Sequence, residues 1–179
     1  SPAKMRDAFR ELADLLRDAG CDLILLEMMF YPHRVRLVLE AAVATGLPVW
    51  AGFSVRRDED GAIVSFAPEQ SIPFDDVLAT LDGVDVQAAG IMHSSSDVIE
   101  EAVAEVRSRF DGPLLAYPDS GYFRMPHWQF EQIIAPEALV AFAQRWVAGG
   151  VTILGGCCGL SPEHIAALRE AFPRSAVPA

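Results

Sequence analysis

Residues 147–168 read VAGGVTILGGCCGLSPEHIAAL and contain the pattern that decides the fold. The apolar run 151–155 follows a helical segment and a Gly-Gly pair, which predicts a short buried strand. Ser161 and Pro162 suit the cap and the first position of a helix, which we expect over 162–171. A helix, a buried strand and another helix in succession are typical of a parallel α/β sheet.

The same alternation runs through the rest of the chain. Four more apolar runs are predicted to be strands, at 22–28, 48–54, 84–91 and 113–117. Helices are expected from Pro73 and over 3–19, 32–46, 96–109 and 136–148. A polar loop with a turn at Asp60-Gly61 and a long loop at 118–135 lie between them. We expect one α/β domain over 1–179, and periodicity alone permits either a doubly wound sheet or a segment of a barrel.

Composition excludes several classes of protein. The 179 residues are 51% apolar with a net charge of −11, which disfavours nucleic acid and anionic membranes as partners. No apolar run reaches the roughly 20 residues of a membrane helix, and the charged N-terminus lacks the apolar core of a signal peptide. Three cysteines, two of them adjacent, form a poor disulfide framework. We therefore expect a cytoplasmic protein.

Polar or metal-binding side chains follow every predicted strand. In parallel α/β folds the functional site lies at the carboxyl ends of the strands, so these side chains should share one face. They are, in chain order, Glu27, Ser54, His93, Asp119 and the pair Cys157-Cys158.

The adjacent cysteines are the sharpest of these signals. On a regular strand Cys157 and Cys158 would point to opposite faces, but the flanking glycines let the backbone turn so that both thiols could reach one metal ion. The following helix N-terminus would favour thiolates there. The alternatives are two buried cysteines beside a tight turn, or a redox pair. Redox motifs more often have the spacing C-x-x-C, and adjacent cysteines form a strained ring.

Several segments resemble the homocysteine S-methyltransferase family. They are GCDLILLEMM, GLPVWAGFS, GPLLAYPDSG and, above all, the GGCCG segment with its flanks, in the family's order and spacing. The resemblance implies a (β/α)₈ barrel of the TIM type and a catalytic zinc ion bound by Cys157 and Cys158. It also implies that Glu27 binds the amino-acid end of homocysteine. The zinc would hold the substrate thiol as a thiolate, which attacks a methyl group on a sulfonium, ammonium or folate donor.

The chain departs from the family pattern where the third zinc ligand is expected. The family has G-x-N-C there, and this chain has Gly90-Ile91-Met92-His93. We expect His93 to be the third ligand, since Cys₂His is a known catalytic set, although a lone histidine at a strand end is more often simply solvated. A neutral imidazole would make the zinc more electrophilic and its thiolate less nucleophilic. The Met92 and His93 substitutions also leave open a catalytically impaired homologue that binds zinc or a ligand.

The other candidate site residues have simpler structural interpretations. Asp119 replaces the family's usual asparagine and could favour a cationic methyl donor, but we expect a turn residue after Pro118. Cys21 is expected to be buried, and Trp128 could either cover the site or pack as an ordinary aromatic. The remaining histidines are expected at the surface or at helix ends; they are His33, His127 and His164.

The number of strands falls short of a complete barrel. A (β/α)₈ barrel usually needs about 250 residues and eight strands, and the five strands here match the family's fourth to eighth. We expect an open arc of parallel strands in sequential order, with Glu27 and Cys157 on opposite flanks of the opening. The remaining strands could belong to a longer protein, which we favour, or to another chain, or self-association could cover the edges.

Overall fold

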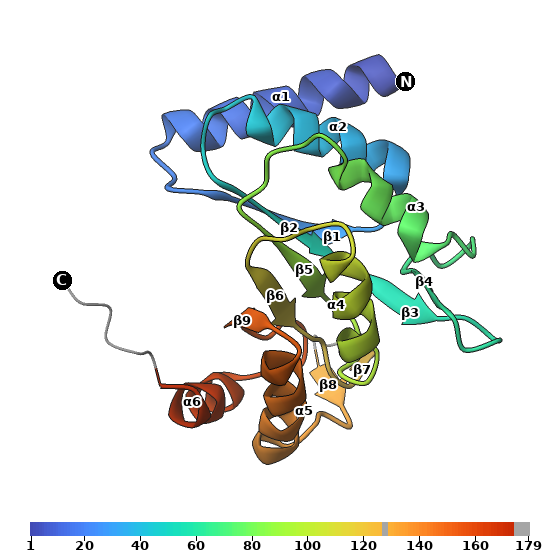
Figure 1. Ribbon diagram of the computed structural model, residues 1–179, viewed down its shortest axis with the longest axis vertical. Helices are drawn as coiled ribbons and strands as arrows, with labels where there is room; N and C mark the ends of the chain where they lie inside the picture. The colour runs from blue at the N-terminus through green and yellow to red at the C-terminus, as the bar shows by residue number, and fades with distance from the viewer. Residues whose placement is uncertain (127–128, 174–179) are drawn as a thin grey trace.

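Five parallel strands form a single sheet in sequential order. The computed structural model describes residues 1–126 and 129–173, and Figure 1 shows its arrangement. The order β1-β2-β5-β6-β9 has no crossover, which excludes a doubly wound sheet with its switch point and agrees with an arc of a (β/α)₈ barrel. The bounds are β1 Ile24–Met29, β2 Val49–Phe53, β5 Ala88–Met92, β6 Leu114–Tyr117 and β9 Val151–Leu154.

The helices follow one another around one side of this sheet (Figure 1). The predicted helices over 136–148 and 162–171 match at both ends, and proline stands in the first turn of four helices, where its missing N–H is not needed. Within the described residues, none of the helices is both long and apolar enough to cross a membrane. Their bounds are α1 Pro2–Asp18, α2 Pro32–Val43, α3 Phe74–Leu78, the 3₁₀ helix η1 Ala79–Leu81, α4 Ile99–Arg107, α5 Pro136–Ala148 and α6 Pro162–Ala171.

The core lies between the sheet and the helices. Along β1, Ile24 and Leu26 are buried toward the helices, whereas Leu25 on the other face is 38% exposed. Leu39 of α2 and Trp146 of α5 are almost fully buried on the helical side. The opposite face corresponds to a barrel interior, which remains open because the arc does not close.

Two short hairpins lie where loops were predicted. β3 (Val55–Arg57) pairs with β4 (Ile63–Ser65), and β7 (Tyr122–Arg124) pairs with β8 (Gln129–Glu131). Strands of three residues are too short to show a period of two in the sequence, so only the turn at Gly61 was predictable. His127 and Trp128 lie outside the described residues.

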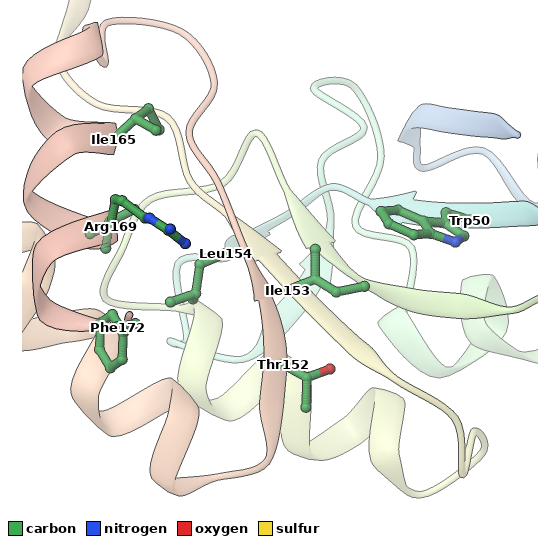
Figure 2. Close-up of a pocket in the computed structure, with 8 residues that line it drawn as sticks. Trp50, Thr152, Ile153, Leu154, Ile165, Arg169 and Phe172 are labelled. Atoms are coloured by element: carbon green, nitrogen blue, oxygen red, sulfur yellow. The ribbon is translucent and has the colours of Figure 1, made fainter. Parts of the chain in front are cut away.

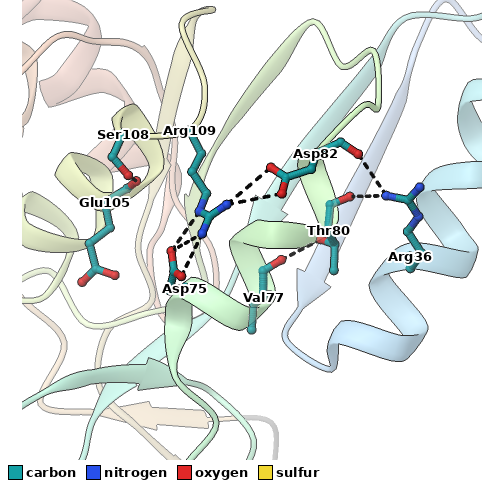
Figure 3. A network of polar contacts seen from close by, with 8 residues as sticks. All are labelled: Arg36, Asp75, Val77, Thr80, Asp82, Glu105, Ser108 and Arg109. Atoms are coloured by element: carbon teal, nitrogen blue, oxygen red, sulfur yellow. Dashed lines mark hydrogen bonds and ion pairs between the residues drawn. The ribbon is translucent and has the colours of Figure 1, made fainter.

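An exposed network of arginine contacts ties the middle helices together (Figure 3). Arg36 of α2 donates hydrogen bonds to the backbone oxygens of Thr80 and Asp82, at 3.3 and 3.1 Å. Arg109, after α4, pairs with Asp75 of α3 and with Asp82. These contacts fix the positions of the outer helices from α2 to α4 relative to one another.

Candidate metal centre and substrate opening

Three metal-binding side chains meet at the carboxyl end of the sheet. His93 follows β5, and Cys157 and Cys158 follow β9, with β6 between these two strands. One ligand atom of each of the three lies within 4.8 Å of the others. The structure thus brings together the three residues expected to bind the metal, although His93 and Cys157 are 64 positions apart in the chain.

The cysteine loop is shaped by its contact with the segment after β6. The backbone N–H of Cys157 donates to the oxygen of Pro118 at 2.8 Å, and that of Ser120 donates to the oxygen of Cys158 at 2.9 Å. Gly159 has φ +76°, and a Cβ there would lie 1.9 Å from the Ser120 oxygen. Glycine is therefore required at 159 for the two loops to approach, and the turn places the two Sγ atoms 3.8 Å apart.

His93 is aimed at the cysteines by an unusual backbone conformation. Its φ is +43°, and its N–H donates to the Tyr117 oxygen at 3.2 Å. Nδ1 lies 3.5 Å from Sγ of Cys157, and the ring of Phe66 packs edge-on against the imidazole at 5.3 Å between centroids. The ring is thus fixed with one nitrogen facing the thiols.

The donor set fits a tetrahedral zinc ion. Zn–S and Zn–N bonds of about 2.3 and 2.0–2.1 Å imply separations of roughly 3.5–3.8 Å between neighbouring ligand atoms. The distances of 3.5 Å between His93 Nδ1 and Cys157 Sγ and 3.8 Å between the two Sγ atoms agree with this. Two sulfurs and an imidazole nitrogen suit zinc and leave a fourth position for a substrate.

Burial has the largest influence on the pKa of Cys157. It raises the pKa of this thiol to about 11, against a smaller lowering by a backbone hydrogen bond. The direction of this shift is opposite to the one expected from the nearby helix N-terminus. A metal ion would therefore bind with release of a proton from this cysteine.

Glu27 lies across the opening from the cysteine loop. It is on β1 and Cys157 follows β9, the two outermost strands of the arc. The register of β1 shifts between Leu26 and Met29, and Met28 has φ +57°, so a bulge interrupts the strand at Glu27. The carboxylate belongs to the wall of a pocket of about 300 Å³, lined by Leu25, Glu27, Trp50, Leu115, Tyr117, Ile153, Leu154, Gly155 and Gly156.

Tyr117 places a second polar group in this opening. Its hydroxyl is buried and makes no hydrogen bond of normal geometry with the described residues. Burial raises the pKa of Tyr117, and the negative charges of Glu27 and Cys157, together with the approach of the hydroxyl to the Glu27 carboxylate, raise it further. The alternation of strand 113–117 places this side chain on the interior face with Leu115, but no sequence motif marks it as a site residue.

The model of the homocysteine S-methyltransferase family matches residues 1–172. The chain belongs to this family. A selenocysteine Se-methyltransferase of Brassica oleracea is 28% identical over 175 residues, which are 93% of this chain and 48% of the relative. The homocysteine S-methyltransferase of Escherichia coli is 29% identical over 169 residues, 89% of this chain and 51% of that protein. The chain thus spans about half the length of the curated relatives it matches.

Solved structures of this family share the fold. The apo form of the homocysteine methyltransferase MmuM from Escherichia coli superposes with a TM-score of 0.72 at 26% identity, covering 96% of this chain and 57% of that one. The metallated form of the same enzyme gives 0.69 at 27% identity, covering 93% and 52%.

Met92 occupies the place of the asparagine expected from the family pattern. Its side chain is 2% exposed, and its sulfur accepts hydrogen bonds of 3.2 Å from the N–H of Met28 and from Oγ of Ser54. A thioether thus fills the family's polar position as a weak acceptor.

The structure also corrects two of the other expectations, for Asp119 and Cys21, and places His164 at a helix end as expected. Asp119 lies in an irregular segment instead of a turn, with its N–H donating to the Ser94 oxygen at 3.2 Å. Cys21 is half-buried, because it precedes β1 at the edge of the core. His164 stands in the first turn of α6 as expected of a helix-end histidine, but it is only 5% exposed. Phe66 was missed, because nothing in its sequence surroundings places it against a residue on another loop.

Proposed function

We propose that this chain is part of an enzyme that uses zinc to transfer a methyl group to a small thiol, such as homocysteine, to give methionine. The observation that carries the proposal is the cluster of His93, Cys157 and Cys158 at the rim of the opening lined by Glu27. The names of the relatives, homocysteine and selenocysteine methyltransferases, support the same chemistry.

His93, Cys157 and Cys158 would hold the zinc, which when bound would keep the substrate thiol ionised near neutral pH. The substrate sulfur then attacks the methyl carbon: a new S–C bond forms while the donor's bond to that carbon breaks, and the donor leaves with the electron pair. A sulfonium, ammonium or folate can serve as donor.

The chain's own residues orient the substrate across the opening. Glu27 provides a carboxylate for the ammonium group of an amino-acid thiol. Tyr117 lines the same opening beside Glu27. A histidine in place of a third thiolate makes the site less negative by one charge, so we expect a less nucleophilic substrate thiolate than with three cysteines. Reduced cysteines suit a cytoplasmic enzyme.

Metal analysis of purified variants tests the zinc site. The wild-type protein should contain one zinc per complete site, and the Cys157→Ala, Cys158→Ala double variant should contain none, because one imidazole cannot hold the ion. Cys21→Ala removes a thiol away from the cluster and should keep the full zinc content. Unchanged zinc in the double variant would contradict the proposed ligands.

Catalytic turnover is tested by a screen of thiol acceptors with several methyl donors. We expect methylation of homocysteine or a similar thiol by the zinc-loaded protein when the complete barrel is present. A complete barrel that binds zinc but methylates no thiol with any donor class would instead indicate the impaired homologue, in which Met92 has replaced a needed polar contact.

A further inference from the structure

The imidazole of His93 lies between a thiol and a carboxylate. On one side Nδ1 is 3.5 Å from Sγ of Cys157, and on the other Nε2 is 3.9 Å from Oδ2 of Asp119. The second distance is too long for a direct hydrogen bond but suits an ion pair or a contact bridged by water. Asp119 is not itself one of the clustered ligands.

Both side chains are held in this arrangement by the structure around them. His93 and Asp119 follow the adjacent strands β5 and β6, and their side chains are only 21% and 26% exposed. The N–H of Asp119 donates to the oxygen of Ser94, the residue after His93, so the two loops are joined at this point. The ring of Phe66 limits rotation of the imidazole.

We propose that Asp119 is a positioning residue that prepares His93 to bind the metal. Its carboxylate attracts the proton to Nε2 and so leaves the lone pair of Nδ1 facing the thiols. Histidine ligands of metal sites commonly have such a carboxylate partner, which fixes the ring and makes the binding nitrogen more basic. The inference rests on the proposed zinc site.

The charges in the site support this pairing. A histidine in place of the family's third cysteine removes one negative charge from the ligand set. Aspartate in place of the usual asparagine returns one negative charge next to that histidine. Two of the chain's three departures from the family pattern, at 93 and 119, thus lie face to face and offset each other in charge.

Zinc affinity in a double-mutant cycle tests the inference, by competition with a chromophoric chelator. Asp119→Ala should weaken zinc binding by about 10-fold to 100-fold, the usual effect of losing such a partner. Asp119→Asn should weaken it less, because the amide oxygen can still accept from Nε2 through a bridging water. In the His93→Cys background both changes should alter the affinity by less than about 3-fold, because no imidazole remains to be oriented.

A second readout keeps the test decisive if the His93→Cys protein binds no zinc. In the cobalt-substituted protein, Asp119→Ala should shift the ligand-field bands, while Asp97→Asn, which changes another acid of the same rim, should leave them unchanged. The role of Asp119 would be overturned if Asp119→Ala left the cobalt spectrum or the zinc affinity unchanged. It would also be overturned if Asp119→Ala lowered the zinc affinity equally in the wild-type and His93→Cys backgrounds. Failure of the wild-type protein to bind zinc would instead overturn the proposed function.

Discussion

Gly52 of β2 lies in close contact with two side chains of the barrel interior. A Cβ on this residue would lie 2.7 Å from the hydroxyl of Tyr117 and 2.8 Å from Cγ of Met92. It would also lie 3.2 Å from the backbone oxygen of Leu26, which cannot move freely. The absence of a side chain at 52 therefore lets Tyr117 and Met92 enter the interior.

We predict that Gly52→Ala destabilises the protein by about 1–3 kcal/mol, since an extra carbon in a filled interior forces its neighbours to shift. Urea unfolding measures the change. Tyr117→Phe removes one of the two clashing atoms, so the double variant should recover part of the loss. Tyr117→Phe alone should be nearly neutral, because the hydroxyl it removes makes no hydrogen bond of normal geometry. Equal stability of Gly52→Ala and wild type would contradict this packing.

At the scale of single residues, the sequence predicted which residues belong to the site better than it predicted which of them contact one another. Cys157, Cys158 and His93 were identifiable because a strand end and flanking glycines mark them within a few residues. Asp119 was visible too, but its proximity to His93 depends on how two loops settle beside adjacent strands. No local pattern encodes that distance.

The start of α6 depends on a buried histidine. Nδ1 of His164 accepts from the N–H of Ser161 at 3.1 Å, and Nε2 donates to the oxygen of Ile134 at 2.7 Å. The first bond caps the helix and the second joins it to the segment before α5. Because α6 follows the cysteine loop directly, this contact also fixes one end of the candidate metal centre.

His164→Ala should lower the free energy of unfolding by about 1–3 kcal/mol, through the loss of two hydrogen bonds at a buried position. Thermal and urea unfolding give the value. His164→Gln can keep the capping contact with Ser161 and should lose less. If alanine and glutamine were equally and negligibly disruptive, the histidine would not hold the helix start.

Elements with strong periodicity were predicted well, and those decided by tertiary contacts were not. Strand β5 begins at Ala88, four residues later than the predicted strand over 84–91. Val86 is buried before the strand begins, so an apolar run alone overstates its length. The two hairpins were missed because pairing between segments of three residues depends on the turn and on neighbouring chain.

The molecule as a whole is an open arc. In the described part of the chain, β1 and β9 each have a neighbouring strand on one side only. A cavity of about 540 Å³ lies beside β9 (Figure 2), where Ile165 and Arg169 of α6 and Phe172, just after the helix, face Leu154. In a closed barrel the next strand would lie along β9, so we interpret this cavity as the place that such a strand would occupy.

We therefore predict that the 179-residue chain alone does not methylate thiols and associates through its unpaired edges. Size-exclusion chromatography with light scattering measures the association. Supplying the three N-terminal β/α units, by fusion to those of a relative, should reduce association and allow turnover. A monomeric, active 179-residue chain would show that the other strands are not needed.

X-ray absorption at the zinc edge tests the central claim most directly. For the zinc-loaded barrel we predict two sulfur ligands at about 2.3 Å and an imidazole nitrogen at about 2.0–2.1 Å, from Cys157, Cys158 and His93. Addition of homocysteine should raise the sulfur number from two to three, as the substrate thiol takes the fourth position. A first shell without sulfur, or a sulfur number unchanged by the thiol, would contradict the account.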